Sequence, residues 1–316
     1  MASEESRGGG VSLKGATQQR VGGRGLDGKR ASSGRLSSGL FLLPSSAFVI
    51  ILLLLPFALT TVQSFTRDDG LRPPKPNGIS NYTNLIADPS VQQSLLNTVF
   101  WTIGAIILPA SIGLTVAVLT NGIRWGKVFQ TVFVLPFALS GVATGTIWKF
   151  MLSTEGPANQ FLSAIGLESI TQGWLLHWPG NTIAMILVYA WQTSGVALIL
   201  FLVGLQSVPT ETVEAARLDG ATGPTLFWRI IFPQLKSITV VVIGISLANG
   251  LRVFDLIWVL TGGGPGQASE TLAVTMYRKT FILGQYGVGA AVAVMLTVIV
   301  LSTSWLYLRS QMPKRG

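Results

Sequence analysis

The sequence lacks cysteine, has a single histidine and is poor in charged residues. The absence of cysteine excludes disulfides and thiolate metal sites. The one histidine, His177, lies between Trp174 and Trp178, which favours an aromatic belt at a membrane surface over a metal or proton-relay site. Charged residues make up 11% of the 316 residues, against about 25% in soluble domains. Because 49% of the chain is hydrophobic, this shortage of charge indicates a protein whose solvent is lipid.

Residues 1–39 are rich in Gly, Ser, Lys and Arg and contain few large apolar residues. Such a segment cannot bury enough surface to offset its conformational entropy, so we expect a disordered basic tail. Within it, residues 23–30 nearly match a phosphate-binding P-loop. Arg30, however, occupies the position of the Ser or Thr hydroxyl that would hold magnesium, and no strand or helix is expected on either side. We therefore predict no nucleotide site in this tail.

Six apolar segments with few or no charges follow, each long enough to cross a bilayer as a helix of about 20 residues. For the first segment a cleaved signal peptide is the alternative, although the apolar core of such a peptide would run for only about 7–15 residues. The sequence thus predicts an all-α membrane protein with an external loop at 66–90, a core at 91–308 and a short C-terminal segment at 309–316. The six predicted spans are residues 40–65, 95–120, 128–151, 182–205, 238–260 and 286–308.

The distribution of Lys and Arg predicts how these spans are oriented. With the N-terminus in the cytoplasm, the inner segments hold fifteen of these residues and the outer segments hold five. Positive charge is enriched on the cytoplasmic side of membrane proteins, so both termini and the connection at 207–236 are predicted to be cytoplasmic. The same bias accounts for the net charge of +9, and no nucleic-acid partner is expected.

The connection at 207–236 is predicted to form two short helices joined by a turn. Thr210, which follows a proline, is a plausible N-cap of the first helix. Glu214 and Arg217 have the i,i+3 spacing of a side-chain ion pair. Gly220 supplies the left-handed conformation that often ends a helix. The plainer alternative is an amphipathic loop that packs only against its own helices.

The sequence of this connection resembles the EAA loop of binding-protein-dependent ABC importer permeases. The resemblance lies in Glu214-Ala215-Ala216, followed by Asp219-Gly220-Ala221 and by Phe232-Pro233. It departs at Phe232, where leucine is usual, and at Ser237, near the position where a second proline often follows. The resemblance implies that this segment couples to an ATPase and that the paired alanines allow its close approach. The residues implied to couple are Glu214, Ala215, Ala216, Arg217, Asp219 and Gly220.

A second segment, residues 254–265, resembles the end of the fifth span in MalF-type carbohydrate-uptake permeases, a branch that includes the glycerol-3-phosphate permease. Together the resemblances cover residues 40–310. They imply the six-helix permease fold of type I ABC importers, located in the cytoplasmic membrane of a bacterium. The implied partners are a second, MalG-type permease, an ATPase dimer, an extracytoplasmic solute-binding protein and membrane lipid.

The implied function is ATP-driven import of a sugar or oligosaccharide. ATP and magnesium would be used by the separate ATPase, and this chain, a permease without its own ATPase site, would bind no cofactor or metal. One alternative is the same kind of permease for glycerol 3-phosphate or another polyol. An ATP-independent secondary transporter is the weaker alternative, because such proteins more often have inverted repeats and acidic ion sites near the bilayer midplane.

Polar side chains recur on one face of the fourth and fifth spans at helical spacing. Polar groups within a membrane usually face a cavity or another helix. Counted from the Glu-Ala-Ala motif, these faces resemble the positions that line the sugar pathway of the family, although hydrogen bonding between spans is the alternative. Hydroxyls and amides suit a neutral polyol. The residues are Tyr189, Gln192, Thr193 and Val196 in the fourth span, and Ser246, Asn249, Gly250 and Val253 in the fifth.

Two charged residues, Arg252 and Asp255, lie within the predicted fifth span. Their i,i+3 spacing most simply predicts an intramembrane ion pair, or contacts with the second permease, in a structural or gating role. If Arg252 were instead unpaired and faced the pathway, an anionic substrate such as a sugar phosphate would be favoured.

Overall fold

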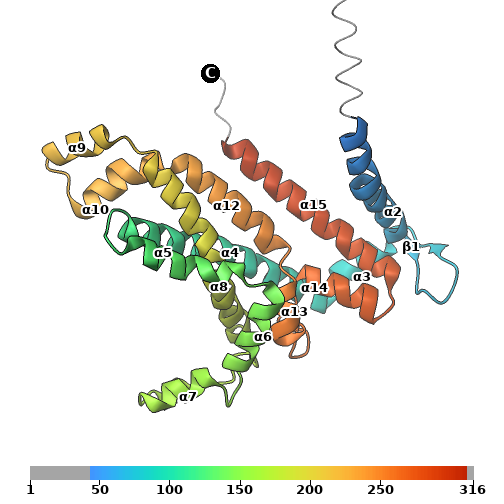
Figure 1. Ribbon diagram of the computed structural model, residues 1–316. Coiled ribbons are helices and arrows are strands. Elements are labelled where there is room, and N and C mark those ends of the chain that lie inside the picture. Colours follow the sequence, from blue (N-terminus) through green and yellow to red (C-terminus); the bar gives the residue numbers. More distant parts are fainter. Residues whose placement is uncertain (1–42, 312–316) are drawn as a thin grey trace, which may run out of the picture. The chain divides into compact units, whose positions relative to one another are not determined.

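The computed structural model describes residues 43–311 and is mostly helical over that range (Figure 1). Within that range the single sheet is the antiparallel pairing of β1 (Thr66–Arg67) with β2 (Lys75–Pro76). The predicted disordered tail at 1–39 lies outside the described residues. The chain divides into two units, residues 1–55 and residues 56–316.

The described part of the first unit, residues 43–55, is helical. It begins the helix Leu43–Ser64, in which Ile50–Leu54 is π-helical and α2 covers Leu55–Ser64. Every side chain from residue 43 to residue 55 is exposed. An apolar helix with no buried face is what a lipid-facing span requires, and it agrees with the predicted first span.

The body of the second unit consists of α4 (Pro89–Thr120), α8 (Gly180–Gln206), α12 (Lys236–Leu251) and α15 (Tyr286–Gln311) (Figure 1). Helices α8 and α12 both pack against α4. The approach of α8 to α4 is close, because a Cβ built on Gly113 would lie only 2.6 Å from the Cβ of Ala197. Small residues at such an interface allow the dense packing that holds membrane helices together.

The helices allow the predicted number of spans only if two bent helix pairs are each counted as one. Among the described residues, four helices are long and apolar enough to cross a membrane, and the number rises to six with the pairs Gly126–Ala138 with Gly141–Met151 and Gly223–Gln234 with Lys236–Leu251. The second pair begins within the connection predicted at 207–236 and ends at Leu251, whereas the fifth span was predicted at 238–260. The four are Leu43–Ser64, Pro89–Thr120, Gly180–Gln206 and Tyr286–Gln311.

The third predicted span, at 128–151, is two helices rather than one. Helix α5 (Gly126–Val134) ends in the 3₁₀ turn η2 (Leu135–Ala138), and α6 (Gly141–Met151) then leaves at an angle of 100°. Pro136 lacks the amide hydrogen that an α-helix needs at this point. Ser140 starts the new helix, since its hydroxyl accepts a hydrogen bond from the amide of Ala143 at 3.1 Å.

The fifth predicted span, at 238–260, is also interrupted. Helix α12 ends at Leu251 and α13 (Asp255–Thr261) begins after a break of three residues. The backbone of Phe254 is non-helical, with φ −136° and ψ −61°. Broken backbone at membrane depth is tolerated where protein buries it or where it lines a cavity. The break lies between Arg252 and Asp255, the two charged residues of the predicted span.

Short elements occupy the connections between the long helices. Helix α3 (Ser80–Ala87) precedes α4, whereas α7 (Pro157–Ala164) and η3 (Glu168–Ile170) precede α8. The opposite end of α8 leads into α9 (Thr210–Leu218), α10 (Gly223–Leu226), the π-helical η4 (Phe227–Ile231) and α11 (Phe232–Gln234) (Figure 1). After α13, helix α14 (Leu272–Tyr277) and η5 (Arg278–Ile282) lead to α15.

Candidate functional site

The segment between α8 and α12 forms the two short helices and the turn predicted for residues 207–236. Helix α9 ends in two capping hydrogen bonds, from the amide of Ala221 to the carbonyl of Ala216 at 2.9 Å and from the amide of Gly220 to that of Arg217 at 3.0 Å. This pair is the Schellman arrangement, which requires a left-handed residue after the helix. Gly220 provides it with φ +86°, which confirms the predicted role of this glycine in the turn.

Two finer predictions about α9 are wrong. Pro209, rather than Thr210, is the N-cap residue, and no side chain caps this end. Glu214 and Arg217 do not pair with each other, because the ion pairs among residues 43–311 involve other residues. Both side chains are exposed. Their charges are therefore available to a partner protein rather than to each other.

The exposed surface of α9 differs from the predicted one at two positions. Ala216 is only 8% exposed, so it is covered by its own chain and does not offer a face to a partner, as had been expected of both alanines. Ala215 and Asp219 are exposed. Leu218 is 89% exposed, an unusual position for a leucine in a polar connection. Its place between the charged residues Arg217 and Asp219 is the signal in the sequence that could have identified this exposure.

Between α9 and α12, three aromatic side chains of η4 and α11 pack together as a cluster. The ring centroid of Trp228 lies 5.0 Å from that of Phe227 and 5.0 Å from that of Phe232. Leu226, which precedes Phe227, is buried. Helix α9 contacts both α10 and η4. Contacts thus run from α9 through η4 and α11 to α12.

The interruptions in the third and fifth spans border one cavity of about 310 Å³. The α5–α6 bend contributes Phe137, Leu139 and Gly141, and the break after α12 contributes residues 252–256. Five of the residues predicted to line the pathway lie in its wall: Tyr189, Gln192, Thr193, Asn249 and Val253. The predicted faces of the fourth and fifth spans thus do meet at a cavity.

Three other predicted positions lie elsewhere. Gly250 faces α4, because a Cβ built on it would lie 2.9 Å from the Cβ of Ala105. Its lack of a side chain serves helix packing, so its predicted place in the pathway is wrong. Ser246 and Val196 are half-buried and are not among the residues that line the cavity.

Hydrogen bonds within the chain orient several polar groups of the cavity wall. The Gln192 amide donates to the carbonyl of Leu139 at 2.9 Å and ties α8 to the bend before α6. The Thr193 hydroxyl donates to the carbonyl of Tyr189 at 2.8 Å. The ring of Tyr189 is held edge-on by Trp101, with centroids 5.7 Å apart. The aromatic ring and amide groups are thus positioned before any ligand arrives.

Arg252 and Asp255 both line this cavity but do not form the predicted ion pair. Arg252 Nη2 donates instead to Asn249 Oδ1 at 3.0 Å. The prediction assumed a continuous helix, in which residues three apart share a face. Because the helix breaks between them, that geometry is lost. The ion pairs found among residues 43–311 are Arg278–Glu270 and Lys279–Asp88.

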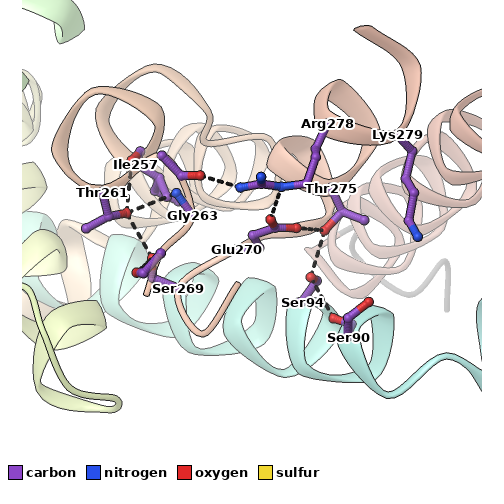
Figure 2. Close-up of polar contacts among 12 residues, drawn as sticks. Ser90, Ser94, Ile257, Thr261, Gly263, Ser269, Glu270, Thr275, Arg278 and Lys279 are labelled. Atoms are coloured by element: carbon purple, nitrogen blue, oxygen red, sulfur yellow. Dashed lines mark hydrogen bonds and ion pairs between the residues drawn. The ribbon is translucent and has the colours of Figure 1, made fainter. Parts of the chain in front are cut away.

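A buried polar network around Glu270 was not predicted (Figure 2). Glu270 is 1% exposed, and its carboxylate accepts hydrogen bonds from Arg278 Nε and, at 2.8 Å, from the hydroxyl of Thr275. That hydroxyl lies 2.7 Å from the hydroxyl of Ser94 on α4. Asn97 of α4 donates to the carbonyl of Glu270 at 2.9 Å. These hydrogen bonds hold the segment that contains Glu270 and Thr275 against α4.

Arg278 and Lys279 had been counted only as charges of an outer connection. The sequence does contain one signal for the buried ion pair of Arg278 with Glu270: Glu270 is the sole acidic residue after Asp255. Lys279 lies 3.4 Å from Asp88, which precedes α4. The hydrogen bond from the Ser90 hydroxyl, together with Lys279, holds the pKa of the Asp88 carboxyl below its usual value.

Comparisons with known proteins identify the family. Residues 110–311 match the model of the binding-protein-dependent transport system inner membrane component. A probable ABC transporter permease protein of Bacillus subtilis, YurN, is 34% identical over 275 residues, covering 85% of this chain and 94% of the relative. The trehalose/maltose transport system permease protein MalF of Thermococcus litoralis is 31% identical over 277 residues, covering 85% and 92%. MsmF of Streptococcus mutans, a multiple sugar-binding transport system permease protein, is 35% identical over 224 residues, covering 71% and 77%.

A solved structure has the same fold. The crystal structure of a bacterial ABC transporter involved in the import of the acidic polysaccharide alginate matches with a TM-score of 0.76 at 21% identity, covering 89% of this chain and 96% of that one. The predicted fold class, an ABC importer permease, and the predicted membrane location are thereby confirmed. The chain belongs to the family of binding-protein-dependent transport system inner membrane components and is a permease of an ABC importer.

Proposed function

We propose that this permease moves a sugar or oligosaccharide into the cell through the cavity beside the break in the fifth span. The observation that carries the proposal is that two polar faces, chosen from the sequence for their resemblance to a sugar pathway, meet at one cavity. The relatives named for trehalose/maltose and for multiple sugars support a carbohydrate substrate. The volume of about 310 Å³ is at the lower end of the roughly 300–1,000 Å³ of small-molecule sites.

The chemistry of the cavity wall suits a polyol. Arg252 donates hydrogen bonds, Asp255 accepts them, and the amides of Gln192 and Asn249 have capacity for both. Tyr189 and Phe254 add aromatic surface on which a sugar ring can pack. A sugar presents hydroxyl groups at its edges and C–H groups on its faces, and this wall offers a partner to each.

Coupling to ATP hydrolysis would take place at α9. We propose that the exposed Glu214, Arg217, Leu218 and Asp219 contact an ATPase subunit and that Gly220 sets the direction in which the chain leaves α9. Closure of the ATPase dimer around ATP would displace α9, and the aromatic cluster would transmit the displacement to α12. The far end of α12 carries Asn249 in the cavity wall, so the motion reaches the substrate site.

The remaining assembly follows from the same proposal. A second, MalG-type permease would complete the pathway, and an extracytoplasmic solute-binding protein would deliver the sugar. ATP and magnesium would be used by the ATPase subunits, with no cofactor held by this chain. The excess of Lys and Arg in the predicted inner segments supports cytoplasmic termini and a cytoplasmic α9.

Transport by the reconstituted complex tests this function. Proteoliposomes containing both permeases and the ATPase subunits, supplied with the binding protein, are expected to accumulate a labelled sugar from a panel of mono- and oligosaccharides only when ATP is present. Glycerol 3-phosphate belongs in the panel as the alternative substrate. Uptake that proceeds without ATP and follows an ion gradient would contradict the proposal and support a secondary transporter.

A further inference from the structure

The cavity holds one cationic and one anionic side chain that do not neutralise each other. Arg252 lies at the C-terminal end of α12 and Asp255 in the first turn of α13, and both are exposed to the cavity. The intervening backbone is non-helical, which separates two charges that a continuous helix would have placed side by side. Within the described residues 43–311, neither belongs to an ion pair.

The hydrogen-bonding capacity of both charged groups remains largely available. Arg252 makes its hydrogen bond to Asn249 Oδ1, and a guanidinium has five N–H donors in total. Asp255 lies in the first turn of α13 and beside Gly141, at the start of α6. A Cβ built on Gly141 would lie 3.2 Å from the Asp255 Cβ and 3.5 Å from its Oδ2. The positive N-terminal end of α6 favours a carboxylate at this place.

The two charges impose opposite requirements on a ligand. A guanidinium only donates hydrogen bonds and a carboxylate only accepts them, whereas a hydroxyl does both. Neighbouring hydroxyls of an uncharged sugar therefore satisfy both side chains with charge-assisted hydrogen bonds. A phosphate or carboxylate on the ligand would bind Arg252 but would be repelled by Asp255. Both effects are strengthened where water is displaced at membrane depth.

We infer that Arg252 and Asp255 are the specificity-determining residues of this cavity, which bind an uncharged polyhydroxylated sugar and exclude anionic sugars. This inference rests on the proposed function and names the substrate class within it. Arg252 alone would favour a sugar phosphate or a sugar acid. Asp255 in the same cavity wall removes that advantage.

Direct binding to the permease–ATPase complex, without the solute-binding protein, isolates this selectivity. Scintillation-proximity binding in nanodiscs would use maltose, trehalose and xylose as uncharged probes and maltobionate, glucuronate and glucose 6-phosphate as anionic probes. The unmodified complex is expected to bind an uncharged probe about tenfold or more tightly than any anionic one. Asp255→Asn is expected to reduce this ratio about tenfold, chiefly by tightening the anionic probes.

Arg252→Gln is expected to act differently: it weakens the uncharged probe about tenfold and leaves the anionic probes excluded. Glu168→Gln, which removes an exposed carboxylate in η3, is the matched control and is expected to change neither affinity. Thermal unfolding of each complex confirms that the variants are folded. A purely structural role would weaken all probes equally in both cavity variants, which would overturn the inference.

Two further results would also overturn it: a wild-type preference for an anionic probe, or binding of none of the probes. The outcome is separable from that of the proposed function. ATP-dependent sugar uptake together with unselective binding would leave the transport function intact and remove only the role of Arg252 and Asp255. Absence of ATP-dependent uptake would contradict the transport function itself.

Discussion

Replacing Gly220 by valine is expected to reduce ATP-driven uptake about tenfold or more while the membrane helices remain folded. Gly220 has φ +86°, donates one of the two capping bonds at the end of α9 and sets the turn that allows the other, from Ala221. A left-handed conformation costs an L-residue roughly 1–2 kcal/mol, and more when the side chain is β-branched. The cheaper response is for the turn to change its path. Helix α9 would then be presented at a different angle to the ATPase, because the residues that follow lead directly into α10.

Uptake, ATPase co-purification and thermal unfolding of the complex would all be measured. Gly166→Val is the matched control: Gly166 has φ +78°, and, as at Gly220, no atom lies within 4 Å of a Cβ built there. The two variants thus bear a similar backbone strain, but Gly166 lies in the connection before α8, at the end opposite α9. Uptake is expected to fall about tenfold or more for Gly220→Val only, since a misplacement of about 1 Å can cost a coupled step two orders of magnitude. Retained uptake and ATPase binding in Gly220→Val would contradict the role of this turn.

Replacing Glu270 by alanine is expected to destabilise the permease by about 3 kcal/mol, because it leaves the guanidinium of Arg278 without its carboxylate in a largely buried place. The hydroxyls of Thr275 and Ser94 would lose part of the same network. The segment between α13 and α15 would then be held to α4 only by the remaining contacts of Asn97 and its neighbours. Loss of folded protein on extraction into detergent is the expected consequence.

Lys279→Ala is the control for this experiment. It also removes one partner of an ion pair in η5, but the side chains of that pair are 18% and 31% exposed, and such pairs contribute about 0–1 kcal/mol. It leaves the Asp88 carboxylate free to cap α4 through the amide of Ser90. Thermal unfolding of the two variants in the same detergent measures the difference. Equal losses of stability would mean that the buried network contributes no more than a solvated ion pair.

The number of spans and the coupling turn could be predicted because their signals are local. Runs of about 20 apolar residues identify helices in lipid whatever the tertiary structure is. The turn at Gly220 follows from a glycine placed after a short polar helix. The faces of α8 and α12 could be predicted in part, since helical spacing places Tyr189, Gln192 and Asn249 correctly. The same spacing also selected Gly250, because it cannot distinguish a residue facing a cavity from one facing a neighbouring helix.

The breaks at Pro136 and after Leu251 were missed because hydropathy averages over them: the residues on both sides are apolar. Arg252 and Asp255 marked the second break, but a charge within an apolar run is equally compatible with an intact helix and an ion pair. The network of Glu270 depends on which segments meet in three dimensions. Its partners Ser94 and Thr275 are 181 positions apart, so no local pattern connects them.

Site-specific cross-linking tests most directly the central claim that α9 is the part of this permease that contacts the ATPase. The chain has no cysteine, so a single introduced thiol is unique in it. Leu218→Cys, at a side chain that is 89% exposed, is expected to cross-link to an ATPase subunit carrying a thiol-reactive group, with a yield that changes when ATP is added. Leu71→Cys, at a side chain that is 91% exposed in the connection before α4, is expected to give no such product. Equal cross-linking from both positions, or none from Leu218→Cys in an assembled and active complex, would contradict the claim.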